Sequence, residues 1–329
     1  MAPRRQRLRG SRWRCHSLPF QCMTAHTLSG RSTYGFVLTL TVCVLWGIFP
    51  IAAKSVLLET DPYTLNFYRF SLPSVILWMF LLRRRQLPSL WRGAQRPLLK
   101  RVLIASFLLI GNYIFFAFAL GHITPSGAQV LIQAGTMMLL LSGVFLFGEQ
   151  FSTRQWLGCL TFMAGLVSFF FYHILDMFDG FGSYAIGMGL MLLAAVTWAA
   201  YAILQKPLLD KISSAQILLV VFALGVVVFL PLADLSAVLS MSISALIGLS
   251  FCVLSTLVGT ACFAEALAHW EASKISATLT TIPLFTLLFM QVLSRYPGFK
   301  ISAEPISGLT IFGALLVVCG AGMVAIGKR

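Results

Sequence analysis

Two cations in the sequence stand inside or at the end of long apolar runs, where a charge needs a partner. Arg69 lies within the apolar run 62–82, and a charge near the centre of a lipid bilayer costs about 2.5–3.5 kcal/mol on insertion scales. Its guanidinium group therefore either pairs with a carbonyl group, Glu59 or Asp61, or binds an anionic group of a ligand. Lys54 lies near the end of the preceding run, so its ammonium group either enters a pocket or extends to the interface.

Glu265 is the carboxylate nearest to the interior of an apolar run. A carboxyl group at that depth could take up and release a proton, and so couple proton movement to that of a substrate. Its place near the end of the run 242–266 also allows a simpler arrangement. A hydrated carboxylate would then pair with His269, one helical turn on, or with Lys274.

Uncharged polar and aromatic side chains form a third group of candidates. Gln129 and Gln133 lie one helical turn apart in the run 126–147, and Thr280 occupies a similar position in the run 273–294. Such residues either make hydrogen bonds between helices or line a cavity, and the bulk of glutamine favours the cavity wall. The other candidates for this wall come from three further runs: Trp46, Asn112, Tyr113, Trp198 and Tyr201.

The chain that carries these residues is too apolar for a soluble protein. Its 329 residues are 58% hydrophobic and 10% charged, with a mean hydropathy of +0.88, whereas about a quarter of the residues in a soluble domain are charged. Runs of about 20 apolar residues are long enough to cross a bilayer. The sequence predicts an all-α membrane protein with ten such transmembrane helices, at 34–57, 62–82, 99–120, 126–147, 154–173, 183–205, 214–232, 242–266, 273–294 and 306–326.

The basic residues indicate how the chain is oriented. Most of the 24 Lys and Arg residues lie in the N-terminal segment or in connections on one side of the predicted membrane, as is typical of cytoplasmic segments. This places both termini in the cytoplasm of a multi-pass inner-membrane protein, and it explains the net charge of +14 without a nucleic-acid partner. Residues 1–33 are predicted to be a disordered tail that contacts anionic lipid, unless Met23 is the true start.

The sequence also repeats itself. Phe116–His122 resembles Phe263–His269, and Trp46 with Lys54 resembles Trp198 with Lys206. Each copy holds five predicted helices, an odd number, so the second copy enters the membrane from the opposite side. We therefore predict two inverted five-helix repeats, 34–173 and 183–326, an organisation typical of secondary transporters.

A third set of matches pairs Glu149, Ser152, Gly158 and Gly165 with Glu304, Ser307, Gly313 and Gly320. These glycines allow close helix packing, either within the chain or in a homodimer.

These motifs resemble the EamA-like family of the drug/metabolite transporter superfamily. The resemblance covers about 34–326 and is carried by short motifs in order: Trp46-Gly47 with Lys54, Tyr68-Arg69-Phe70, Ala119-Leu120 with Ser126, Phe147-Gly148-Glu149-Gln150, and Gly158 with Gly165. It implies a ten-helix inverted-repeat fold and the export or exchange of small metabolites, without naming the substrate. The chain departs from the pattern at Pro305, where the first half has Gln150, and in an insertion at 295–300.

Signatures of enzymes and cofactors are absent from the sequence. It contains no H-E-x-x-H motif, Walker loop or Gly-rich dinucleotide motif, and its cysteines form no C-x-x-C pair. We therefore predict no catalysis, metal or cofactor, and a permease that moves a small metabolite or drug-like compound outwards, driven by a gradient or by exchange. Two alternatives remain: a lipid-handling, flippase-like protein that holds lipid phosphate with Arg69 and Lys54, and a non-transporting sensor or assembly subunit.

Overall fold

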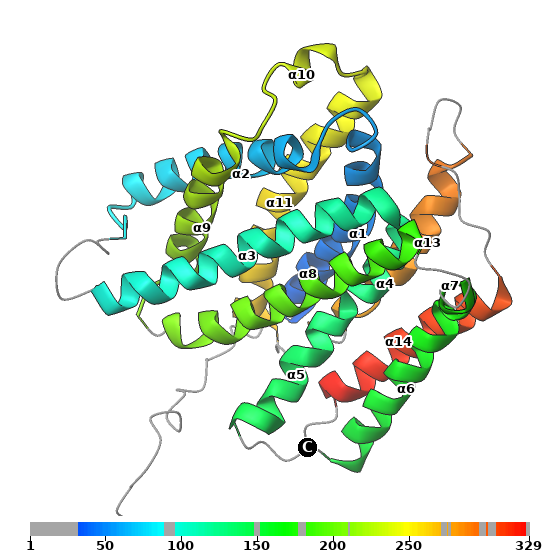
Figure 1. The fold of residues 1–329 in the computed structure, drawn as a ribbon. Helices are drawn as coiled ribbons and strands as arrows, with labels where there is room; N and C mark the ends of the chain where they lie inside the picture. The colour runs from blue at the N-terminus through cyan, green and yellow to red at the C-terminus, as the bar shows by residue number, and fades with distance from the viewer. Residues whose placement is uncertain are drawn as a thin grey trace, which may run out of the picture.

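In the computed structural model, most of the described residues lie in helices, and no strand occurs among them (Figure 1). The described residues are 32–88, 96–147, 152–176, 182–209, 211–270, 275, 278–295, 301 and 307–326.

Five of the helices contain stretches long and apolar enough to cross a membrane by length and composition. They are α1 (Ser32–Val56), α2 (Pro62–Arg83), α3 (Arg96–His122), α8 (Ser183–Gln205) and α11 (Ile243–His269). The shorter helices are α4 (Pro125–Leu131), α5 (Gln133–Phe147), α6 (Thr153–Phe169), α7 (Phe171–Asp176), η2 (Lys206–Leu208), α9 (Ser214–Phe229), α10 (Ala237–Ser240), α13 (Ile282–Leu293) and α14 (Gly308–Ile326). The number of ten crossings stays a prediction, whereas the all-helical, apolar architecture is confirmed.

Polar caps fix where several of these helices begin. The Asp61 side chain accepts hydrogen bonds from the first backbone N–H groups of α2, and Pro62 occupies the first helical position. Ser152 and Ser213 start α6 and α9 with capping boxes. Because the first N–H groups of a helix have no partner within it, these caps stabilise helix ends near the edge of the apolar layer.

The two halves of the chain interlock. Helix α1 packs on α11 and α13, and in the corresponding arrangement α8 packs on α3 and α5. Helix α2 packs on α9, and α6 lies along α14 at one edge of the molecule (Figure 1). Each of these pairs joins the first half to the second, and the contacts recur in the order expected of a duplicated unit. Both halves therefore contribute to the centre of the molecule.

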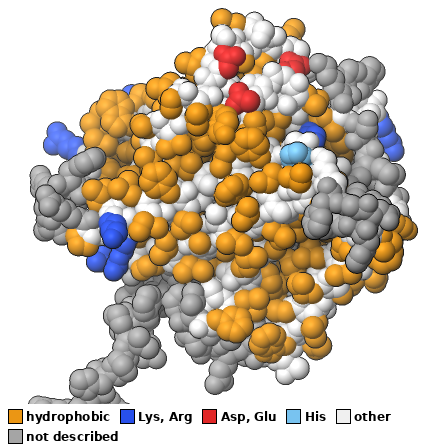
Figure 2. Space-filling model, in the orientation of Figure 1, with side chains coloured by type: hydrophobic (Ala, Val, Ile, Leu, Met, Phe, Trp, Pro, Cys, Tyr) orange, Lys and Arg blue, Asp and Glu red, His pale blue; other side chains and the backbone are white. Residues whose placement is uncertain are grey.

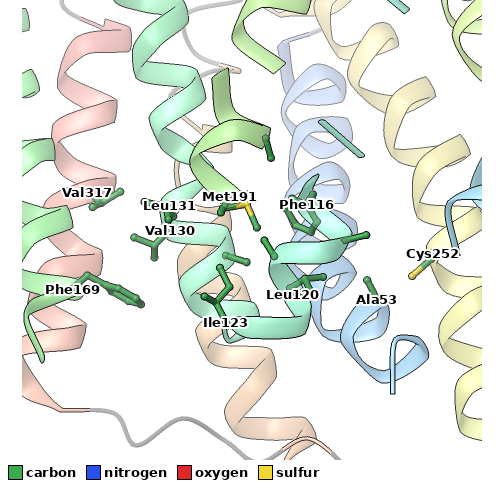
Figure 3. Packing of buried hydrophobic residues seen from close by; sticks show 14 of the residues in the cluster. Ala53, Phe116, Leu120, Ile123, Val130, Leu131, Phe169, Met191, Cys252 and Val317 are labelled. Carbon is green, nitrogen blue, oxygen red and sulfur yellow. The ribbon is translucent and has the colours of Figure 1, made fainter. Parts of the chain in front are cut away.

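The main core lies where these helices meet. Figure 3 shows Phe116 and Leu120 of α3 near Met191 of α8 and Leu131 of α4, all of which are buried. By contrast, much of the outer surface in view is hydrophobic (Figure 2), and Leu160 of α6 is 67% exposed. An apolar exterior around an apolar core suits a protein whose solvent is lipid.

Glycines bring α6 and α14 into backbone contact. A Cβ atom added to Gly165 would lie 2.5 Å from the backbone nitrogen of Val317, and one added to Gly158 would lie 2.8 Å from the carbonyl oxygen of Gly320. Gly313 faces the same interface from α14. The glycines therefore serve packing within the chain, and a homodimer stays a prediction that they do not support.

Two predicted helices are interrupted at corresponding points. The run 126–147 forms α4 and α5 with a break at Ile132, and the run 273–294 has a turn at Thr280 and Thr281 before α13 begins. At both breaks a backbone N–H bonds only three residues back, from Gly135 to Ile132 and from Leu284 to Thr281, each at 3.0 Å. The interruption is thus a tightened turn present in both halves.

Candidate functional site

Arg69 is the buried cation around which the candidate site is built. It stands about 12 Å along α2 from the Asp61 cap, at 1.5 Å per residue, and only 6% of its surface is exposed. Its Nε group donates to the hydroxyl oxygen of Thr256 at 3.2 Å. Its Nη1 group donates to the side-chain oxygen of Asn66 at 3.2 Å. Since Thr256 belongs to α11, the guanidinium group bridges the two halves.

Aromatic rings cover this guanidinium group. Its central carbon lies 4.2 Å from the ring centroid of Phe49 and 4.4 Å from that of Tyr113. Cation–π contacts of this kind stabilise a charge that has lost water. Helices α1, α2, α3 and α11 thus meet at one positive group, and the structure brings Arg69 and Tyr113, two of the candidate residues, into contact.

The two acidic residues considered as partners of Arg69 are engaged elsewhere. The Glu59 carboxylate accepts from the backbone N–H and the hydroxyl group of Ser242, at 2.8 and 2.7 Å. Asp61 caps α2. The acidic side chains in view gather at the end of the molecule that carries α10 (Figure 2). Among the described residues, no carboxylate pairs with Arg69, so its charge is held by neutral acceptors and rings.

Asn66 and Thr256 are functional candidates that the sequence analysis did not single out. The Asn66 amide group donates to the carbonyl oxygens of Pro62 and Tyr113, at 3.0 and 3.2 Å, which orients its own oxygen towards Arg69. The Thr256 hydroxyl group donates to the carbonyl oxygen of Cys252 at 2.8 Å, so its oxygen also faces the guanidinium group. In the sequence, the one indication of a role for Asn66 is its position one helical turn before Arg69.

The glutamines and Thr280 lie at the two helix breaks. Gln133 is the first residue of α5, and its side-chain oxygen accepts from the hydroxyl group of Thr136 at 3.3 Å. Gln129 donates from Nε2 to the carbonyl oxygen of Trp46 at 3.1 Å. Thr280 donates to the carbonyl oxygen of Val318 at 3.5 Å. Gln129 and Thr280 therefore tie neighbouring helices together beside the breaks.

The remaining candidates for the cavity wall make contacts with neighbouring helices and rings. Asn112 donates from its amide group to the carbonyl oxygen of Ala194 at 2.9 Å, which joins α3 to α8. Tyr201 is buried in the same apolar cluster as Tyr113. Trp198 lies against Gly135 at the first helix break. Trp46 stacks at a tilt on Phe263, with ring centroids 5.9 Å apart.

The ammonium group of Lys54 contacts the end of a neighbouring helix, and a role for it in a pocket stays a prediction. Its ammonium group donates to the carbonyl oxygens of Leu120 and, at 3.1 Å, Ile123. These carbonyl groups lie at the C-terminal end of α3, where the helix dipole is negative and carbonyl groups lack partners. Lys54 therefore secures one helix end to another. A shallow pocket of about 200 Å³ lies beside this end, and none of the predicted site residues lines it.

Glu265 has the geometry of an exposed, paired carboxylate. Its side chain is 56% exposed, and Oε1 lies 3.0 Å from Nε2 of His269, one turn on along α11. Lys274, the other partner that was considered, lies outside the described residues. This arrangement gives no support to a role in proton coupling, which stays a prediction.

Comparisons with known proteins agree with this architecture. The EamA-like transporter family matches residues 33–171 and again 185–326. An "Uncharacterized transporter" of Haemophilus influenzae is 36% identical over 295 residues, which cover 90% of this chain and 95% of the relative. The "Uncharacterized inner membrane transporter YhbE" of Escherichia coli is 36% identical, covering 90% and 92%. A "Probable amino-acid metabolite efflux pump" of Escherichia coli is 24% identical, covering 89% and 95%.

A solved structure described only as "Crystal structure of protein" shares the fold. Its TM-score is 0.61 at 19% sequence identity, covering 89% of this chain and 96% of that one. The family resemblance that the motifs predicted is confirmed, because the family matches both halves and the relatives align along nearly their whole length. This chain belongs to the EamA-like transporter family.

Proposed function

We propose that the protein is a secondary-active permease of the cytoplasmic membrane that exports a small metabolite or drug-like compound by alternating access. In this proposal ten helices form two inverted repeats, with both termini in the cytoplasm. The pair of helix breaks at corresponding points of the two halves carries the proposal. Interrupted helices at the interface of repeats mark substrate sites in secondary transporters, because freed backbone groups and half-helix ends line the site.

The contacts around the breaks support this reading. Gln133 and Thr280 occupy corresponding positions in the two repeats, at an offset of 147 residues. The halves are similar enough for each to move in turn against the other, which alternating access requires. The absence of a Walker loop in the sequence favours a gradient or an exchanged solute as the driving force.

Export is the direction we favour over uptake. One relative is named as an efflux pump for amino-acid metabolites, and a family likeness to an exporter supports the same direction here. The lipid-handling alternative required Arg69 and Lys54 to hold lipid phosphate. It is less favoured because Arg69 is buried and Lys54 is bonded to carbonyl groups.

Metabolite profiling of cells and medium tests the proposal. Strains that lack or overproduce the protein would be compared, and the compound identified would then be measured in proteoliposomes without ATP. We expect it to accumulate in the medium on overproduction and in the cells on deletion. No difference in any compound, with folded protein in the membrane, would contradict transport; accumulation in the cells on overproduction would contradict export.

A matched pair of variants tests the role of the breaks. Thr281→Val removes a hydroxyl group that bonds to the carbonyl oxygen of Thr278 at 2.6 Å within the second break. Thr41→Val removes the same kind of bond, to Val37 at 3.0 Å, within unbroken α1. One such bond contributes about 0.5–1.5 kcal/mol, so we expect Thr281→Val to change the export rate by about 2- to 10-fold and Thr41→Val to leave it unchanged. Equal effects would contradict a special role of the break.

A further inference from the structure

We infer that Arg69 binds one anionic group of the cargo, so that the cargo is a small organic monoanion with an apolar body and no ammonium group. Asn66 and Thr256 act as the positioning residues that aim the guanidinium group. The inference rests on the proposed transport function and names the class of its substrate.

One nitrogen of the guanidinium group has no hydrogen-bond partner among the described residues. The rings of Phe49 and Tyr113 lie within 4.4 Å of its central carbon, so a ligand has to approach along the edge of the group. Nε and Nη1 each donate to a neutral side chain, while Nη2 donates to no described residue. A carboxylate is the acceptor that suits the edge of a guanidinium group, with strong charge-assisted bonds.

The charge of Arg69 is not balanced within the described interior. The buried polar residues there are hydroxyl and amide side chains apart from Arg69 itself, and no Asp or Glu is among them. Asn66 and Thr256 accept hydrogen bonds but carry no charge. An anionic ligand would therefore neutralise a charge that the protein leaves unpaired, which is a gain that a neutral ligand lacks.

The second repeat shows that packing alone does not need this cation. Helices α2 and α9 begin at the caps Asp61 and Ser213, and Val221 stands as far from its cap as Arg69 does from its own. Val221 is fully buried in an apolar cluster. Thr256 likewise corresponds to Leu109, which lies in that same cluster. The crossing of α9 with α3 is therefore filled with hydrocarbon, while the corresponding crossing of α2 with α11 holds a charge and its acceptors.

The residues around Arg69 indicate the chemistry of the rest of the cargo molecule. Phe49 packs against Phe116, with ring centroids 5.6 Å apart, and Tyr113 packs against Phe70 at 4.7 Å, so an apolar or aromatic body suits the walls. An ammonium group, as in an amino acid, would find no carboxylate among the described buried residues. A second negative charge would find no second free cation there, because Lys54 is bonded to two carbonyl groups.

Three matched probes test the inference on the full-length protein in detergent: 3-phenylpropionate, its neutral amide 3-phenylpropionamide, and L-phenylalanine, which adds only an ammonium group. Binding would be measured by calorimetry. We expect the wild-type protein to bind 3-phenylpropionate at least about tenfold more tightly than either of the other probes. Equal affinity for the amide, or no binding of 3-phenylpropionate at millimolar concentration, would overturn the anion site.

The variant Asn66→Asp separates ligand binding from packing. It keeps the size of the side chain but places a carboxylate beside Arg69, so a purely structural arginine would be better satisfied. Asn66→Asp and Asn66→Ala both lose the donation of the amide group to the carbonyl oxygens of Pro62 and Tyr113, so a comparison of the two isolates the added charge. We expect 3-phenylpropionate to bind about tenfold or more weakly in Asn66→Asp. Asn66→Ala, which removes the acceptor without adding a charge, should weaken binding less. Unchanged binding of the anion in Asn66→Asp would refute the inference.

The same variant distinguishes this inference from the proposed function. If Asn66→Asp exports the profiled compound as well as wild type does, the anion site is wrong while transport stands. If wild-type protein exports nothing, the transport proposal fails, and the probe affinities decide the anion site alone.

Discussion

The backbone contact between α6 and α14 gives a prediction whose size follows from the structure. In Gly165→Ala the new Cβ atom would lie 2.5 Å from the backbone nitrogen of Val317 and 2.9 Å from the carbonyl oxygen of Gly313. Ordinary contacts begin at 3.4 Å, and the obstructing atoms are backbone atoms that cannot rotate away. The two helices must therefore separate by about 1 Å in an interior that is otherwise close-packed.

The expected cost combines two opposing effects. Overpacking costs about 1–3 kcal/mol, and the replacement of glycine by alanine returns up to about 1 kcal/mol of helix propensity. Gly189→Ala in α8 provides the control, because nothing lies within 4 Å of its added Cβ atom. It gains the propensity without the clash, so we expect Gly165→Ala to be less stable than Gly189→Ala by about 1–3 kcal/mol.

Unfolding of both variants in mixed micelles, followed by tryptophan fluorescence, measures this difference. Equal stability of the two variants would refute the argument that the glycines serve packing within the chain. A second readout is the oligomeric mass in detergent. If Gly165→Ala changed the mass while stability stayed constant, the glycine face would instead be a contact between two copies of the protein.

Two further predictions concern the ends of helices. Lys54→Met removes the ammonium group that donates to the carbonyl oxygens of Leu120 and Ile123, so it should lower the stability by about 1–3 kcal/mol. Lys54→Arg should retain most of that stability. An unchanged melting temperature in Lys54→Met would contradict a stabilising role of this contact. The hydroxyl and backbone N–H groups of Ser236 donate to Asp234 at 2.5 and 2.9 Å, which lowers the pKa of that carboxyl group below its ordinary 3.8. Because the folded pKa is the lower one, the turn should be fully stabilised above pH 3.8 and loosen as the pH falls further; hydrogen exchange of the turn should show this in wild type and not in Asp234→Asn.

The large-scale architecture could be predicted because it depends on signals that each segment carries alone. Apolar length predicts helices that can cross a membrane, and the match of Phe116–His122 to Phe263–His269 predicts the duplication. The family match and the interlocked helix pairs agree with both. The orientation in the membrane and the number of ten crossings stay predictions.

The helix breaks were missed for a physical reason. An apolar run keeps its composition when one turn tightens, so hydropathy does not detect a change from four-residue to three-residue hydrogen bonding. Two residues in the sequence mark the positions of these breaks. Gly135 follows the first break, where its lack of a side chain allows close approach to α8, and Pro283 follows the second, where it supplies no N–H group.

Two of the candidate site residues lie together in the structure, and their role in binding stays a prediction. Arg69 and Tyr113 were both proposed, and they are in contact. The partners of Arg69 could not be predicted, because Thr256 reaches it only through the crossing of α2 and α11. Lys54 was expected in a pocket or at the interface, and its contact with the end of α3 could not be predicted because the position of a helix end depends on the fold.

The hydrogen bonds also separate polar residues that hold the fold from those that can serve a ligand. Asn112, Gln129 and Thr280 each donate to a backbone carbonyl oxygen of another helix. Such a donor gives a buried backbone carbonyl group its hydrogen-bond partner, so we expect its removal to lower the stability of the protein before it affects binding. Arg69 differs, since its bonds go to two side chains that are themselves oriented by backbone contacts. A cation built into such an arrangement, with an apolar residue at the corresponding place in the other repeat, is where we propose that the cargo is selected, because a change there need not disturb the packing that both halves share.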